Sequence, residues 1–220
     1  MSSVLRRCFN KPHEWYRVRR ARSESKFDRE FGTDTETVVP LWKLEIDSQY
    51  RDEGTRYQTI DPDAVRIAIE NLPIEFEDFV YIDLGSGKGR TLLIASEYPF
   101  KQTVGVEFSL ELHTIATGNI DRYSKRKCKN VSSLHLDAAS FDFPPDNMVI
   151  YMYHPFGESV FRRVLENLEV SLDHRDREVY VIYFNPVLAN LLDDSAFLER
   201  IELPALAAIY KHIPSSRPLA

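Results

Sequence analysis

The sequence predicts an α/β fold: a doubly wound, mostly parallel, Rossmann-like sheet of seven strands with helices on both faces. Two observations support this prediction. From residue 78 onward, apolar runs of strand length alternate with segments whose apolar residues recur at helical spacing. The chain then carries two apolar runs, 197–203 and 206–213, a short distance apart, which suits a hairpin rather than a parallel crossover. We therefore expect one antiparallel strand.

Five strands are expected before this hairpin. Each is a short run of β-branched, aliphatic and aromatic residues, as strands covered on both faces are. They span 79–84, 103–108, 131–137, 147–154 and 178–184.

Helices are expected to precede and to connect these strands. Asp61 is a typical N-cap and Pro62 fits the first turn of a helix that leads to the first strand. Ser109 is the expected cap of a helix after the second strand. A longer helix with apolar residues at helical spacing follows residue 157.

Composition and charge suggest how the 220 residues are organised. Because 43% of them are hydrophobic, the chain can bury a sizeable core, and no run reaches the length of a membrane span. Residues 1–22 carry seven basic residues against one acid, a balance of +6, whereas the whole chain carries −6. We expect a basic arm (1–30), a cap segment with a helix (31–77), a Rossmann-like domain (78–214) and a tail (215–220).

The basic arm leaves several interpretations open. The preferred interpretation is an arm that is solvated or folds back on the acidic body. Binding of an anionic partner such as nucleic acid and organelle targeting are two further interpretations of equal weight. The chain has two cysteines, which form no disulfide framework, so an intracellular, reducing and cytoplasmic location is expected. No metal site is visible in the sequence, and no membrane association is expected.

A glycine-rich loop follows the first expected strand, as Asp83-Leu84-Gly85-Ser86-Gly87-Lys88-Gly89. Its alternating glycines permit unusual backbone angles and leave room for a ligand against the main chain. A P-loop is excluded, because its first glycine would fall on Ile82 and its Ser/Thr on Gly89. A dinucleotide-binding loop is disfavoured, because Arg90 stands where the third glycine belongs. The remaining candidate ligand is S-adenosylmethionine.

These residues resemble the first motif of the class I S-adenosylmethionine-dependent methyltransferases, an acid followed by G-x-G-x-G. By this resemblance Glu107, with its neighbour Phe108, would contact the cofactor ribose at the end of the second strand. Asp137 would hold the adenine amino group, with Ala138 as a backbone neighbour. The cofactor residues that the resemblance implies in this part of the chain are Asp83, Gly85, Ser86, Gly87, Gly89, Glu107, Phe108, Asp137 and Ala138.

The sequence is also similar to the non-SET histone-lysine methyltransferase group. The shared features are the DLGSG-G loop, Gly105-Val106-Glu107 and the Phe156-Gly157 step after the fourth strand. This likeness implies that Tyr57 and Thr59 touch the methionine end of the cofactor. The chain departs from the group at Tyr153, where the group has an asparagine.

The acceptor site is expected after the fourth strand, where Tyr153, His154 and Phe156 form an aromatic cluster. Aromatic faces attract a methylammonium or a sulfonium, and a histidine can accept a proton near neutral pH. The alternative is that Tyr153 and Phe156 are packing residues and His154 a turn residue. Amino-methylating family members have Asn/Asp-Pro-Pro-aromatic here, and His154-Pro155-Phe156 keeps only part of that pattern.

The sequence therefore predicts an S-adenosylmethionine-dependent methyltransferase that acts on an amine, either a protein lysine or a small molecule. Nucleic acid is a less favoured partner, through the basic arm. Two other classes of protein remain open: a non-catalytic cofactor-binding interaction module and an NAD(P)-dependent oxidoreductase.

Overall fold

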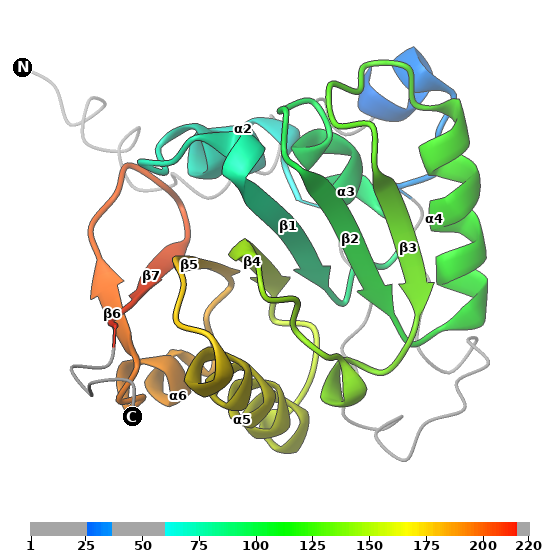
Figure 1. Cartoon of the computed structure of the whole chain (residues 1–220). Coiled ribbons are helices and arrows are strands. Elements are labelled where there is room, and N and C mark those ends of the chain that lie inside the picture. Colours follow the sequence, from blue (N-terminus) through cyan, green and yellow to red (C-terminus); the bar gives the residue numbers. More distant parts are fainter. Residues whose placement is uncertain (1–25, 37–59, 215–220) are drawn as a thin grey trace, which may run out of the picture.

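The computed structural model describes residues 26–36 and 60–214, which contain one sheet of seven strands with helices on both faces (Figure 1). The strands lie in the order β3-β2-β1-β4-β5-β7-β6. β1 to β5 pair in parallel, and β7 pairs antiparallel with both β5 and β6. This confirms the predicted sheet. The strands are β1 Phe79–Leu84, β2 Gln102–Glu107, β3 Val131–His135, β4 Asn147–Tyr153, β5 Val179–Phe184, β6 Leu198–Ile201 and β7 Ala208–His212.

The helices begin where the sequence places their caps. Asp61 accepts a hydrogen bond from the N–H of Asp63 (3.0 Å), and Ser109 accepts one from the N–H of Leu112 (3.3 Å). None of the helices in 26–36 and 60–214 combines the length and the apolar character needed to cross a bilayer. The labelled helices are α2 Pro62–Glu70, α3 Arg90–Ala95, α4 Leu110–Arg122, α5 Glu158–His174 and α6 Ala189–Asp193.

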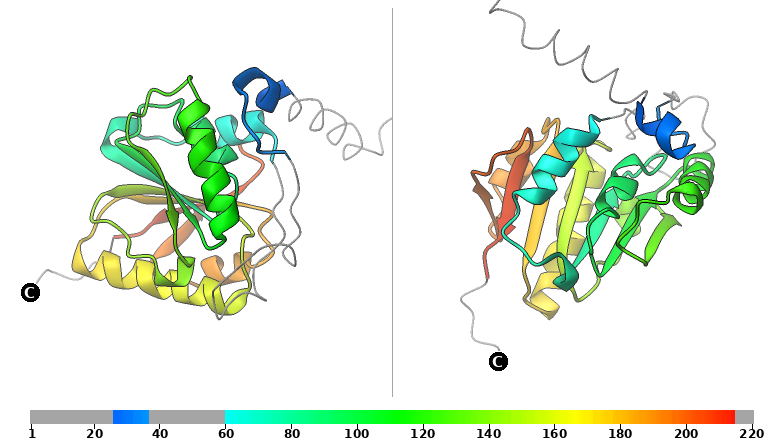
Figure 2. Two further views of the ribbon diagram at one scale, coloured as in Figure 1. Left: turned by 90° about the vertical axis from the view of Figure 1, so that its right-hand side faces the viewer. Right: turned by 90° about the horizontal axis from the view of Figure 1, so that it is seen from above.

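Two hydrophobic cores lie on opposite faces of the sheet. Val80 and Ile82 of β1 pack in the core that contains residues of α5 and α6, whereas Phe79 and Tyr81 pack in the core that contains residues of α2 and α3. Figure 2 shows these two helical layers enclosing the sheet. Every residue of β1 is buried, which explains why the strand is a continuous apolar run in the sequence.

Three strands end earlier than predicted: β2 ends at Glu107 rather than residue 108, and β3 and β4 end early for local reasons. β3 ends at His135 rather than residue 137, because the Asp137 carboxylate accepts a hydrogen bond from the N–H of Ala139 (2.9 Å) and begins a short 3-10 turn. β4 ends at Tyr153 rather than residue 154, because His154 adopts a φ of 42°, outside the extended region. The turns that end β3 and β4 therefore lie at the predicted site.

Candidate functional site

The glycine-rich loop 85–89 leaves the carboxyl end of β1 and leads directly into α3 (Figure 1). Its first, third and fifth residues are glycines with left-handed φ angles of 75°, 53° and 83°. A residue with a Cβ pays about 1–2 kcal/mol for that conformation. The N–H groups of Gly85 and Ser86 both donate to the carbonyl of Val106 (2.9 and 3.1 Å), which ties the loop to β2.

Glu107 ends β2 and is bonded directly to this loop. One carboxylate oxygen accepts a hydrogen bond from the N–H of Gly87 (2.8 Å) and the other accepts one from the N–H of Ser109 (2.8 Å). Burial raises the pKa of the Glu107 carboxyl to about 7, although backbone N–H donors act in the opposite direction. The acid predicted to contact the ribose thus also fixes the shape of the glycine loop.

Asp83 is a second buried carboxyl beneath the loop. It accepts a hydrogen bond from the hydroxyl of Thr91 in the first turn of α3. Burial raises the pKa of Asp83 to about 7; the Thr91 hydroxyl opposes this rise and the Glu107 carboxyl adds to it. The hydrogen bond between Asp83 and Thr91 joins β1 to α3, the two elements that the glycine-rich loop connects.

The turn after β3 lies at the same edge of the sheet. His135 is in register with Glu107, and Asp137 follows two residues later. Asp137 is partly exposed and caps the turn that contains the buried Ala138. Phe108, which follows β2, accepts a hydrogen bond at its carbonyl from Nε2 of His135 (3.1 Å). The predicted adenine-side residues are therefore neighbours of the glycine loop.

The predicted acceptor residues leave the carboxyl end of β4. Nδ1 of His154 lies 3.0 Å from the hydroxyl oxygen of Tyr183, and the N–H of Leu188 donates to the same oxygen (3.4 Å). Partial burial lowers the pKa of His154. The ring of Tyr153 is half-buried and stacks on Phe184 of β5, with 6.4 Å between ring centroids and 13° between planes. Both residues are oriented by β5.

The turn that carries the predicted acceptor residues touches the glycine-rich loop. A Cβ built on Gly85 would overlap Cβ of Pro155 and lie 3.2 Å from its Cγ. The His154–Pro155 turn therefore packs on the glycine loop so closely that only glycine fits there.

Phe156 differs from its two neighbours. Its ring is 6% exposed and packs edge-on against Phe161 of α5 (5.8 Å between centroids) in the hydrophobic core. This packing explains the phenylalanine without any contact to a substrate.

Asn185 lies beside the predicted acceptor residues, although it is not among the site residues predicted from the sequence. It follows Phe184 of β5, just as His154 follows Tyr153 of β4, and these preceding residues are in register. Its φ is 48°, it is exposed, and it precedes a proline, as His154 does. Two adjacent strands thus end in the same strained X-Pro turn. The sequence shows the same X-Pro step, His154-Pro155 and Asn185-Pro186, after both strands, and this repeat is the pattern that indicates Asn185.

A segment far from the loop in the sequence also contacts it. We call residues 26–36 the strap; it lies beside α4 in Figures 1 and 2. Nζ of Lys88 lies 2.8 and 2.9 Å from the two carboxylate oxygens of Asp34, and Nε of Arg90 donates to the hydroxyl of Thr35 (2.7 Å). Arg90, the residue that disfavours a dinucleotide motif, is thus bound by the strap.

Tyr57 and Thr59, which the resemblance places at the methionine end of the cofactor, are outside the described residues.

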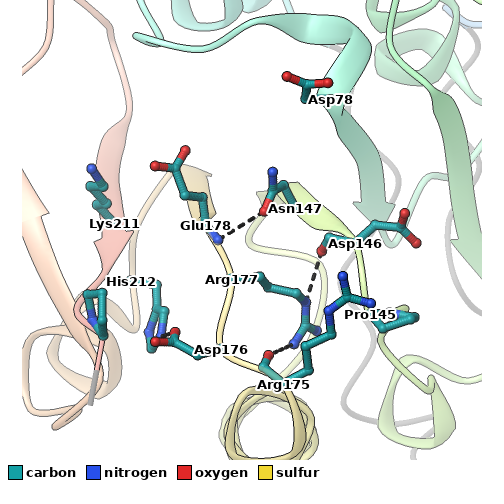
Figure 3. Close-up of a pocket in the computed structure, with 11 residues that line it drawn as sticks. Asp78, Pro145, Asp146, Asn147, Arg175, Asp176, Arg177, Glu178, Lys211 and His212 are labelled. Atoms are coloured by element: carbon teal, nitrogen blue, oxygen red, sulfur yellow. Dashed lines mark hydrogen bonds and ion pairs between the residues drawn. The ribbon is translucent and has the colours of Figure 1, made fainter. Parts of the chain in front are cut away.

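A cavity of about 540 Å³ lies at the opposite, amino-terminal edge of β4 and β5 (Figure 3). There the guanidinium of Arg177 donates to the carbonyls of Asp146 (2.9 Å) and Arg175 (2.7 Å). These hydrogen bonds join residues that line the cavity and so stabilise its wall. None of the predicted site residues lines this cavity.

No known family matches the sequence, and no curated protein does either. Solved structures do match the fold. The 23S rRNA methyltransferase ErmE is 13% identical, with a TM-score of 0.51 over 74% of this chain and 71% of that one. An RNA methyltransferase from Salinibacter ruber, in complex with S-adenosyl-L-homocysteine, is 21% identical, with a TM-score of 0.50 over 73% of this chain and 95% of that one.

A third match is described as a predicted N6-adenine-specific DNA methylase from Listeria monocytogenes. It is 13% identical, with a TM-score of 0.52 over 71% of this chain and 52% of that one. At these identities the likeness establishes the fold. The described part of this chain has the class I S-adenosylmethionine-dependent methyltransferase fold that the sequence predicted.

Proposed function

We propose that this chain is an S-adenosylmethionine-dependent methyltransferase that acts on an amine. The observation that carries the proposal is the glycine loop bonded to Glu107, with the acceptor loop packed against it at Gly85. Lys88 of the loop and Arg90, the first residue of α3, are bound by the strap. The loop thus offers backbone groups and a carboxylate, which suits a nucleoside cofactor without phosphate better than a dinucleotide.

Residues of the chain have distinct proposed tasks. Glu107 would accept hydrogen bonds from the ribose hydroxyls and Asp137 one from the adenine amino group, with the glycine loop as the backbone wall of the site. S-adenosylmethionine supplies an electrophilic methyl group, which leaves its sulfur as the acceptor nitrogen bonds to it. The chain contributes alignment and exclusion of water rather than a covalent intermediate.

His154 is the proposed base for the proton that the acceptor nitrogen loses. Nδ1 of His154 lies 3.0 Å from the Tyr183 hydroxyl oxygen, and this contact orients the imidazole at the end of β4. Burial lowers the pKa of His154, which favours the neutral form at pH 7. The half-buried ring of Tyr153 would offer its face to an ammonium or a methylammonium. The acceptor is then a protein lysine or a small-molecule amine.

A nucleic-acid base is the second candidate acceptor. The half-buried ring of Tyr153, which stacks on the buried Phe184 at the strand ends, is an aromatic group on which a base can stack. Matches with the same fold are described as RNA and DNA methyltransferases, which makes this candidate worth a separate arm of the test.

The test is transfer of labelled methyl from S-adenosylmethionine to three probes: a lysine-rich peptide, a small primary amine and single-stranded RNA. We expect labelled peptide or amine, and a rate at least about 100-fold lower in His154→Gln, because general acid–base catalysis typically contributes about 100-fold to 10,000-fold. The matched control is His174→Gln, at the exposed end of α5. If RNA were the only probe labelled, the acceptor would be a nucleic-acid base, the second candidate. Cofactor binding without transfer to any probe would instead favour the interaction module.

A further inference from the structure

The strap is an ordered unit held together by Asp28. One carboxylate oxygen of Asp28 accepts hydrogen bonds from the hydroxyls of Thr33 (2.6 Å) and Thr35 (2.7 Å), and the other accepts one from the N–H of Thr35 (2.8 Å). Gly32 makes the turn between them with a φ of 64°. These bonds give the strap a defined shape with Thr35 fully buried.

Two cations, Lys88 of the cofactor loop and Arg90 at the start of α3, are buried against this unit. Lys88 is 1% exposed and Arg90 is 2% exposed. Besides Asp34 and Thr35, the strap brings carboxylate oxygens of Asp28 and Glu36 to 3.5 and 3.9 Å from the Arg90 guanidinium. The ring of Phe27 lies under that guanidinium, 5.3 Å from its central carbon. Because buried cations require partners, the loop needs the strap to keep both side chains where they are.

The strap is also anchored to α4. The amide of Asn119 accepts a hydrogen bond from the N–H of Asp34 and donates to the carbonyls of both Asp34 and Lys88, each at 2.9 Å. One side chain therefore joins strap, loop and helix. Phe27 and Phe31 pack on the ring of Tyr123 at the end of α4 (5.7 and 4.6 Å between centroids).

We infer that the strap is the positioning element of the cofactor loop, and that Asp34 and Asp28 set cofactor affinity without touching the cofactor. Lys88 lies between Gly87 and Gly89, and a loop with alternating glycines has much conformational freedom to lose on ordering. Fixing the side chains of Lys88 and Arg90 removes that freedom in advance and holds Gly87 within reach of Glu107. The inference rests on the proposed function only for the identity of the cofactor.

Hydrogen exchange of the loop amides tests this inference without any ligand. The N–H groups of Gly85, Ser86, Gly87 and Gly89 are all hydrogen-bonded, so their exchange reports opening of the loop. In Asp34→Asn and Asp28→Asn we expect faster exchange in peptides covering 84–91. We also expect weaker binding of S-adenosylhomocysteine, by about tenfold if the binding-competent fraction falls to a tenth.

Two control variants separate positioning from general stability. Asp34→Glu keeps the charge and should recover most of the affinity. Val164→Ala in α5, buried on the opposite face of the sheet, should lower stability without changing loop exchange or affinity. Unchanged exchange in the strap variants would overturn the inference, and so would faster exchange with unchanged affinity. If the unaltered protein binds no S-adenosylhomocysteine, the proposed function fails, while loop exchange still decides whether the strap orders the loop.

Discussion

Glu107 and Asp83 are two buried carboxyls with different tasks. Glu107 bonds the N–H of Gly87 and lies at the edge where the cofactor is proposed to bind, whereas Asp83 bonds Thr91 beneath the loop. The sequence predicts both positions, because an acid stands at the end of each of two strands. It does not reveal their protonation, because the pKa depends on burial and on backbone donors that only the folded chain brings together.

The raised pKa values of these carboxyls predict how stability depends on pH. Unfolded, Glu107 loses its proton near 4.5, whereas in the fold it keeps the proton up to about 7. The folded state thus binds more protons in this interval, so its contribution to the free energy of unfolding is complete below about 4.5 and is lost as the pH rises through about 7.

Urea unfolding between pH 4.5 and 8 measures this dependence. The wild-type protein should lose stability as the pH rises across that range, and Glu107→Gln should lose less because one of the two carboxyls no longer titrates. Identical slopes for the two proteins would contradict the assigned burial of Glu107.

At the scale of elements, the site is formed by turns that end neighbouring strands. The loop after β1, the turn after β3 and the X-Pro turns after β4 and β5 meet at one edge because the strands are parallel. Local patterns predict the strands and the caps at Asp61 and Ser109. They do not predict the contacts of Gly85 with Pro155 or of Lys88 with Asp34, since each joins segments distant in sequence.

The contact between the two loops predicts a specific cost for a methyl group at Gly85. Gly32→Ala is the matched control, because Gly32 also has a left-handed φ but has open space around it, and it should cost about 1–2 kcal/mol. Gly85→Ala should cost about 1–3 kcal/mol more, since its Cβ meets Pro155. Urea unfolding of both variants measures the difference.

A second substitution isolates the contact itself. Pro155→Gly removes the atom that the new methyl group would meet, so the double variant Gly85→Ala/Pro155→Gly should be more stable than the sum of the single changes implies. Additive effects would show that the two loops do not touch as described.

At the scale of the whole molecule, the two edges of the sheet differ in kind. The carboxyl-terminal edge carries the glycine loop, Glu107, Asp137 and the proposed acceptor residues Tyr153 and His154. The amino-terminal edge carries the cavity around Arg177. The guanidinium of Arg177 is hydrogen-bonded to Asp146, which also lines that cavity (Figure 3). The fold and the cofactor edge follow from alternation and motif in the sequence. The contact of the strap with the loop does not follow from the sequence, because the acids of the strap stand about fifty residues before the loop.

Calorimetric titration with S-adenosylmethionine tests the central claim most directly, with NADH titrated in parallel. We expect saturable binding of S-adenosylmethionine and weaker binding in the folded Glu107→Ala variant. We expect no binding of NADH, because Arg90 is bound by the strap. Well-folded protein that binds no S-adenosylmethionine would contradict the account. Binding of NADH instead would make the chain a candidate oxidoreductase, with Arg90 released to meet a pyrophosphate.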